Sequence, residues 1–158
     1  MAGDPRILKI TLDERSVIRH SPQVDHERKV AIFDLLEENH FQPIGLEDAG
    51  PFIVHISIEE NRLIFDLRDE SETALERFGL AASTFRRIVK DYFMVCDSYY
   101  QAIKTAAPSK IEAIDMGRRG LHNEGAEILR ERLKEKVLVD LPTARRLFTL
   151  VCVLHIKG

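Results

Sequence analysis

The sequence predicts an α+β fold in which a small antiparallel sheet of three strands packs against four or five helices. Two observations indicate this class: short runs rich in strand-forming residues occur in the first half of the chain, and longer stretches carry apolar residues at helical spacing. A chain of 158 residues can bury about 68–70% of its unfolded surface. With 44% hydrophobic and 31% charged residues, we expect a single domain over residues 1–158.

The predicted strands cover residues 6–12, 52–58 and 62–68. The second and third flank the short polar connection Glu59-Glu60-Asn61-Arg62, which is typical of a β-hairpin. Within the third strand, Leu63, Phe65 and Leu67 alternate with more polar residues and therefore share one face. We expect the helices to cover that face.

Two helices are predicted in the first half of the chain. Ser21 and Pro22 are typical of an N-cap and a first helical position, and the helix they begin should end near Asn39. Its apolar stripe consists of Val30, Phe33 and Leu36, with Leu35 on the adjoining row. The segment 69–79 predicts a short helix that Gly79 closes.

The second half of the chain is predicted to be helical. Ser83 is a suitable N-cap for a helix that Pro108 ends, and a second helix follows at once, so the two should form an antiparallel hairpin. The first of them carries a continuous apolar stripe: Phe85, Ile88, Val89, Tyr92, Cys96, Tyr99 and Ile103. Asp140 opens a last element, in which residues 147–156 are apolar nearly all round and fit either a central helix or a strand.

Charge and cysteine content limit the classes of partner. The net charge is −3, divided into −7 over residues 1–103 and +4 over residues 104–158, which is too weakly basic to favour nucleic acid. The apolar run 147–156 is too short to cross a membrane, so no membrane partner is expected. Cys96 and Cys152 lie among apolar residues, as reduced thiols of a cytoplasmic protein do.

No motif predicts a catalytic residue, a cofactor or a metal. The six histidines show no ligand spacing, and the two cysteines are too far apart in the chain for a zinc knuckle. A phosphate-binding loop and a nucleophile elbow are both missing from the sequence. Composition and motifs therefore favour a binding function over catalysis.

The stretch from Ala113 to Glu127 is the most unusual part of the chain, because Gly117, Gly120 and Gly125 interrupt a good helix pattern. Glycine inside a helix costs about 1 kcal/mol relative to alanine, so three of them require a reason. One interpretation is close packing against another helix or a second copy of the protein. The other is a bend between Gly117 and Gly120 that frees backbone N–H groups for an anion.

A polar cluster lies between these glycines. Arg118 and His122 are one helical turn apart, as are Arg119 and Asn123. Asp115 precedes Arg119 by one turn and is expected to pair with it. These residues fit either a solvated, salt-bridged face or a site for a phosphate or an acidic partner segment.

The chain resembles an uncharacterised bacterial protein family of similar length and of unknown function. Two distinctive segments carry this resemblance, from Ile58 to Asp66 and from Ala113 to Glu127, and it extends over the whole chain. The resemblance implies a soluble intracellular bacterial protein. It implies no activity, cofactor or site residue.

These observations favour a non-enzymatic binding or regulatory module that contacts its partner through Arg118, Arg119, His122 and Asn123, extended by Arg145 and Arg146. The alternative is a small enzyme or a nucleotide- or phosphate-binding protein that uses the same arginines, with His122 as a general acid. A third interpretation makes the row of small residues an interface between copies in a homo-oligomer. Both binding interpretations require the arginines to line a recess.

Overall fold

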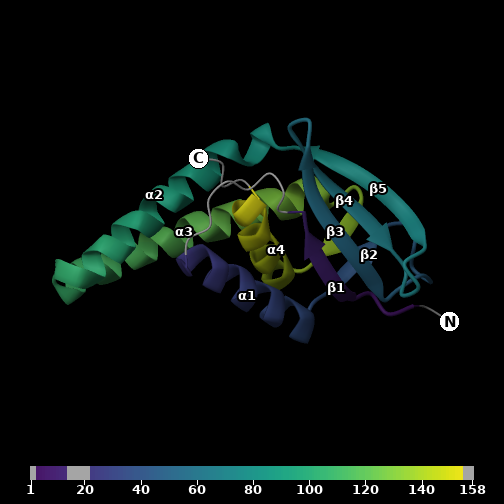
Figure 1. Ribbon diagram of the computed structural model, residues 1–158, viewed down its shortest axis with the longest axis horizontal. Coiled ribbons are helices and arrows are strands. Elements are labelled where there is room, and N and C mark those ends of the chain that lie inside the picture. The colour runs from purple at the N-terminus through teal and green to yellow at the C-terminus, as the bar shows by residue number, and fades with distance from the viewer. Residues whose placement is uncertain (1–2, 14–21, 155–158) are drawn as a thin grey trace.

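The computed structural model describes residues 3–13 and 22–154, which form an α+β fold (Figure 1). A four-stranded sheet consists of β1 (Ile7–Leu12), β3 (Phe52–Glu59), β4 (Arg62–Arg68) and β5 (Ala74–Ala81) in that spatial order. Two short strands, β2 (Phe41–Pro43) and β6 (Val137–Val139), form a separate antiparallel pair. The helices are α1 (Pro22–Glu37), α2 (Ser83–Thr105), α3 (Pro108–Leu133) and α4 (Leu141–Leu154).

The β3–β4 hairpin forms as predicted. Glu59 pairs with Arg62, and the two residues of the turn, Glu60 and Asn61, both have positive φ angles of 51° and 63°. Two positive φ angles are the signature of the tight turn whose twist matches a hairpin. Leu63, Phe65 and Leu67 are fully buried on one face of β4, as their alternation predicts.

The sheet differs from the prediction in two respects. The first strand lies parallel to β3, so the sheet is mixed rather than antiparallel and has four strands rather than three. The segment predicted as a short helix over 69–79 ends instead in β5, and Gly79 lies within that strand. Pairing with β4 overrides the local helix preference of this segment, since Phe78 pairs with Phe65 and the two rings stack at 5.2 Å.

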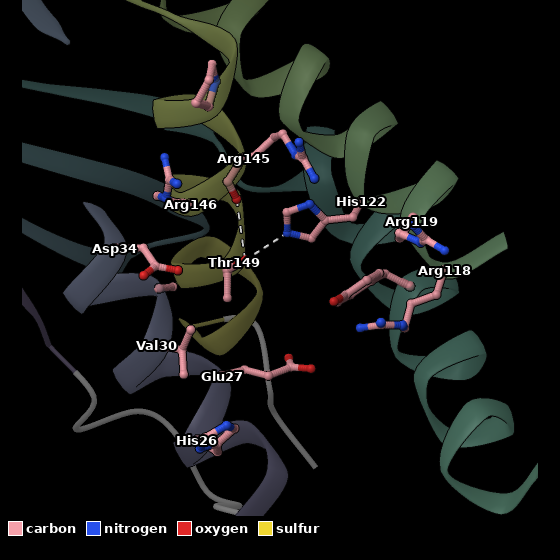
Figure 2. Close-up of a pocket in the computed structure, with 13 residues that line it drawn as sticks. His26, Glu27, Val30, Asp34, Arg118, Arg119, His122, Arg145, Arg146 and Thr149 are labelled. Carbon is pink, nitrogen blue, oxygen red and sulfur yellow. Dashed lines mark hydrogen bonds between the residues drawn. The ribbon is translucent and has the colours of Figure 1, made fainter. Parts of the chain in front are cut away.

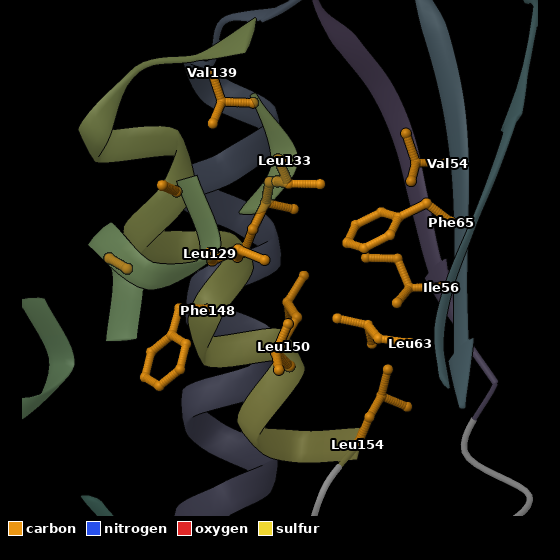
Figure 3. Close-up of a cluster of buried hydrophobic side chains, with 14 of the residues drawn as sticks. Val54, Ile56, Leu63, Phe65, Leu129, Leu133, Val139, Phe148, Leu150 and Leu154 are labelled. Carbon is orange, nitrogen blue, oxygen red and sulfur yellow. The ribbon is translucent and has the colours of Figure 1, made fainter. Parts of the chain in front are cut away.

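Helices cover one face of the sheet, with α4 between α1 and α3 (Figure 1). Figure 3 shows Val54, Ile56 and Leu63 of the sheet pointing toward leucines of α3 and α4. These side chains belong to one continuous apolar core, which also contains Cys96 and Cys152 as free thiols. No helix in the described part of the chain combines the length and the apolar character needed to span a bilayer.

The last element is a helix, which resolves the alternative left open for residues 147–154; residues 155 and 156 lie outside the described part. Asp140 caps α4, because its side chain accepts a hydrogen bond of 2.9 Å from the backbone N–H of Thr143. By contrast, Ser83 is the first residue of α2 rather than its cap, and the N-cap position is Ala82. The proposed cap at Ser21 lies outside the described residues.

The buried faces of the long helices follow the prediction only in part. Phe85 to Cys96 of the α2 stripe are buried, but Ile103 is 49% exposed because the far end of the α2–α3 hairpin projects away from the sheet (Figure 1). In α1 the buried residues are Ala31 and Leu35, whereas Val30 and Phe33 of the predicted stripe are 43% and 63% exposed. Leu35 and the half-buried Leu36 follow the prediction, so the buried face of α1 is shifted toward Ala31 and Leu35.

Candidate functional site

A cleft of about 440 Å³ lies between α1, α3 and α4, with Tyr92 of α2 also among its lining residues (Figure 2). Its most distinctive feature is a group of four arginines that come from two helices. Arg118 and Arg119 come from α3, and Arg145 and Arg146 come from α4. The cleft thus joins the basic cluster of α3 to the arginine pair that the sequence suggested as its extension.

The α3 residues reach the cleft because that helix is continuous from Pro108 to Leu133, without a bend at the glycines. Arg118, Arg119 and His122 all line the cleft. Asn123, the fourth residue of the predicted cluster, is exposed and is not among the lining residues.

The two α3 arginines share one carboxylate. Arg118 Nη2 lies 2.6 Å from Asp115 Oδ1, and Arg119 Nη2 lies 2.9 Å from Asp115 Oδ2. The hydrogen bond from Arg118, reinforced by the charges of both arginines, lowers the pKa of Asp115. Arg118 also stacks over the ring of Tyr99, with its guanidinium carbon 4.9 Å from the ring centroid. Arg118 is therefore held firmly in place at the edge of the cleft.

The two α4 arginines have no such counterion. Within residues 3–13 and 22–154, neither Arg145 nor Arg146 has a carboxylate oxygen within 4.0 Å. Arg145 is exposed and Arg146 is half-buried. Their charge is therefore balanced by no direct partner in this part of the chain.

His122 forms the floor of the cleft. Its Nε2 lies 2.8 Å from Thr149 Oγ1, and its ring packs against Tyr92 and Phe148 at centroid distances of 5.4 and 5.3 Å. The Thr149 hydroxyl also lies 3.4 Å from the backbone carbonyl of Arg145, and the tautomer of His122 decides which partner donates in the shorter bond. Burial lowers the pKa of His122 to about 4, with further lowering by Arg145 and Arg118. The imidazole is therefore neutral at physiological pH, and positive charge from two helices converges on it.

The opposite wall belongs to α1 and is acidic. Glu27 and Asp34 are seven residues apart, which places them two turns apart on the same side of the helix, and Val30 and Ala31 lie between them. The Tyr100 hydroxyl of α2 donates to Glu27 Oε1 over 3.2 Å. Helical periodicity shows only that Glu27 and Asp34 lie on the polar side of this helix, and it does not show which neighbour that side meets.

The three glycines of α3 differ in their surroundings. A Cβ atom at Gly125 would fall less than 3.0 Å from three ring carbons of Phe148, so α3 approaches α4 closely at this point. At Gly117 and Gly120 an added Cβ would meet nothing within 4 Å. Among the described elements none approaches these two glycines closely, and a homo-oligomer built on them stays a prediction.

The described residues contain no group of three or more histidine, cysteine or acidic side chains arranged to hold a metal ion. The lining of the cleft accordingly offers four guanidinium groups, two carboxylates, the imidazoles of His26 and His122, and the hydroxyls of Thr149 and Tyr92 as its polar functions. Such groups can bind an anion and orient it by hydrogen bonds.

The chain is similar over its whole length to bacterial proteins of one family. The sequence model of an uncharacterised protein family (UPF0262) matches residues 4–157. A UPF0262 protein of Bradyrhizobium sp. (strain ORS 278) is 61% identical over 97% of this chain and 91% of its own length. A UPF0262 protein of Paramagnetospirillum magneticum is 59% identical over 97% of each chain. No solved structure matches this chain.

Proposed function

The chain belongs to the uncharacterised protein family UPF0262, as the segments from Ile58 to Asp66 and from Ala113 to Glu127 predicted, and we propose its function from the geometry of the cleft. It is a cytoplasmic, non-enzymatic binding module that holds the phosphate group of a small molecule between α3 and α4. Buried, reduced Cys96 and Cys152 support the cytoplasmic location.

The observation that carries the proposal is the group of cleft arginines that outnumber the carboxylates paired with them in the described residues. Asp115 balances one of the two α3 arginines, while Arg145 and Arg146 lack any ion pair in the described residues. Bringing like charges together is unfavourable unless an anion binds among them. A bound anion would remove this repulsion and would gain hydrogen bonds from several guanidinium groups.

Phosphate fits this cleft better than a carboxylate for a geometric reason. Guanidinium groups present planar pairs of N–H donors that match the oxygens of a phosphate group two at a time. Four such groups, from two helices, offer more donors than a single carboxylate can accept. The volume of about 440 Å³ falls within the usual range for small-molecule sites.

The surroundings of His122 favour binding over catalysis. A threonine–histidine pair can act as nucleophile and base when a carboxylate supports the second ring nitrogen. Here the charges that act on the ring are those of Arg145 and Arg118, and they reduce its basicity. With a pKa of about 4 the ring is not an imidazolium at neutral pH and lacks the acidic proton of one, which argues against the alternative of a general acid.

A small molecule also fits better than an acidic protein segment, the other partner that the sequence suggests. The site is concave, and its α1 wall carries Glu27 and Asp34. A segment with several carboxylates would face both of these side chains, whereas one phosphate group can stay on the arginine side.

A thermal-shift titration tests the proposal. Inorganic phosphate and a panel of phosphorylated metabolites are added to the wild type and to the Arg145→Gln/Arg146→Gln variant. The control is Arg86→Gln/Arg87→Gln, which removes the same charge from an exposed part of α2. A ligand at one hundred times its Kd adds about 2.7 kcal/mol of stability, which raises the Tm of a chain of this size by roughly 5–10 °C.

We expect a phosphorylated ligand to stabilise the wild type and the α2 control equally and to leave the α4 variant unchanged. A panel that shifts none of the three proteins contradicts the proposal. An equal shift in all three places the ligand elsewhere on the molecule.

A further inference from the structure

The two walls of the cleft carry opposite charges, with arginines on α3 and α4 and carboxylates on α1. We infer that the ligand joins its phosphate to a hydrogen-bond-donating group, either an ammonium or an amino group, that faces the α1 wall. This inference rests on the proposed phosphate site and specifies the chemical group that the ligand carries in addition to its phosphate.

Glu27 is positioned as an acceptor for such a group. The Tyr100 hydroxyl donates to Glu27 Oε1 over 3.2 Å, and no hydrogen bond to the other carboxylate oxygen is present in the described structure. Burial, together with the charge of Glu27, raises the pKa of Tyr100 to about 12, so Tyr100 keeps the proton that it donates. The hydrogen bond fixes the carboxylate, while Oε2 accepts no hydrogen bond from residues 3–13 and 22–154.

The two kinds of charge come from different helices of the cleft and are not paired with each other in the described residues. Figure 2 shows Glu27 reaching from α1 toward the α3 wall and Arg118 reaching toward it from the other side. No ion pair within 4.0 Å joins Glu27 or Asp34 to a cleft arginine among the residues that the structure describes. Because these carboxylates and arginines are not paired with each other, a molecule that carries both kinds of group can contact both walls.

Between the two carboxylates the α1 wall is apolar. Val30 is 43% exposed and Ala31 is buried, and both lie between Glu27 and Asp34 along the helix. A short hydrocarbon linker between the phosphate and the donor group would cover Val30. Exposure of this apolar side chain to water is unfavourable in the empty cleft. Contact with the linker would bury it and add to the affinity.

A plain phosphate ester would gain less from the same cleft. Its anionic end would bind the arginines, but the carboxylates of α1 would remain unpaired and would repel it. The carboxylates of α1 thus favour a ligand with a donor group in two ways. They attract the donor group, and they repel a ligand that is wholly anionic. The difference should appear as a preference between two ligands of equal size.

Ethyl phosphate and phosphoethanolamine provide that comparison, since they differ only in the ammonium group. Each is titrated into isotope-labelled protein, and the Kd is measured from NMR shift changes, which detect affinities in the millimolar range. We expect wild type to bind phosphoethanolamine about 10-fold more tightly, as one charge-assisted hydrogen bond predicts. Glu27→Gln keeps an acceptor for Tyr100 and should reduce the preference to about 2-fold or less, and Asp34→Asn tests the second carboxylate in the same way.

The controls distinguish this inference from the proposed function. Arg145→Gln/Arg146→Gln should weaken both ligands by at least about 10-fold, because both use the phosphate site. Equal binding of the two ligands by wild type overturns the donor-group inference and leaves the phosphate site intact. No saturable binding of either ligand overturns the phosphate site itself.

Discussion

Replacing Gly125 with alanine should destabilise the protein, although alanine is the better helix former. The glycine hydrogen faces the ring of Phe148, and a Cβ at this position would overlap three of its carbons. The ring cannot easily retreat, because Phe148 is fully buried and packs against Tyr92 and His122 at centroid distances of 6.3 and 5.3 Å. α3 and α4 would have to move apart.

The size of the effect follows from two opposing contributions. Glycine to alanine inside a helix stabilises by about 0.5–1 kcal/mol, while forcing an extra carbon into a well-packed core costs about 1–3 kcal/mol or more. We therefore expect a net loss of roughly 1–2 kcal/mol for Gly125→Ala. Gly117→Ala and Gly120→Ala, where the new methyl group meets nothing within 4 Å, should each stabilise by about 0.5–1 kcal/mol.

Urea unfolding of the three variants measures this contrast within a single helix. With a slope of about 2 kcal/mol per molar urea, Gly125→Ala and Gly117→Ala should differ by about 1 M in their midpoints. The midpoint of Gly125→Ala should fall below that of the wild type. If Gly125→Ala were as stable as the other two, the close approach of α3 to α4 would be refuted.

Three further predictions follow from the cleft and the core. Because burial keeps His122 neutral with a pKa of about 4, the unfolded chain takes up its proton first; stability is complete above about pH 6.5 and falls by at most about 3 kcal/mol toward pH 4. His122→Gln should remove this pH dependence from the unfolding free energy measured in urea. If the unfolding free energies of the variant and the wild type changed equally with pH, the burial of His122 would be contradicted. Asp115→Asn frees the two α3 arginines, so phosphate affinity measured by calorimetry should rise several-fold, and an unchanged or weaker Kd would exclude these arginines from the site. Leu35→Ala should lower the free energy of unfolding by about 2–5 kcal/mol, and Phe33→Ser should lower it by less than about 0.5 kcal/mol, as thermal unfolding can measure. The reverse order would show that Phe33 is buried, as its place in the predicted stripe implied.

Local patterns predict the elements of this fold better than their arrangement. Alternation identifies β4, and helical spacing identifies the buried half of α2, since each pattern reflects one neighbouring surface. The pattern fails at β5, where Ala74, Leu75 and Glu76 are good helix formers and only the pairing with β4 makes them a strand. The parallel placement of β1 depends equally on its distant partner β3.

The candidate site shows the same division. Arg118, Arg119 and His122 are predictable as neighbours because they lie on one helix, and all three line the cleft. The contribution of Glu27 and Asp34 is not predictable, because it depends on how α1 packs beside α4. Charged residues two turns apart on one helix face indicate only that the face is polar.

The most direct test of the anion-binding cleft is an NMR titration with inorganic phosphate that observes the arginine Nε–H signals. We expect saturable shifts at Arg145, Arg146 and Arg118, with Arg86 and Arg87 on the exposed part of α2 unchanged. Shifts that are linear in phosphate concentration and equal for both groups of arginines would contradict the existence of a built phosphate site.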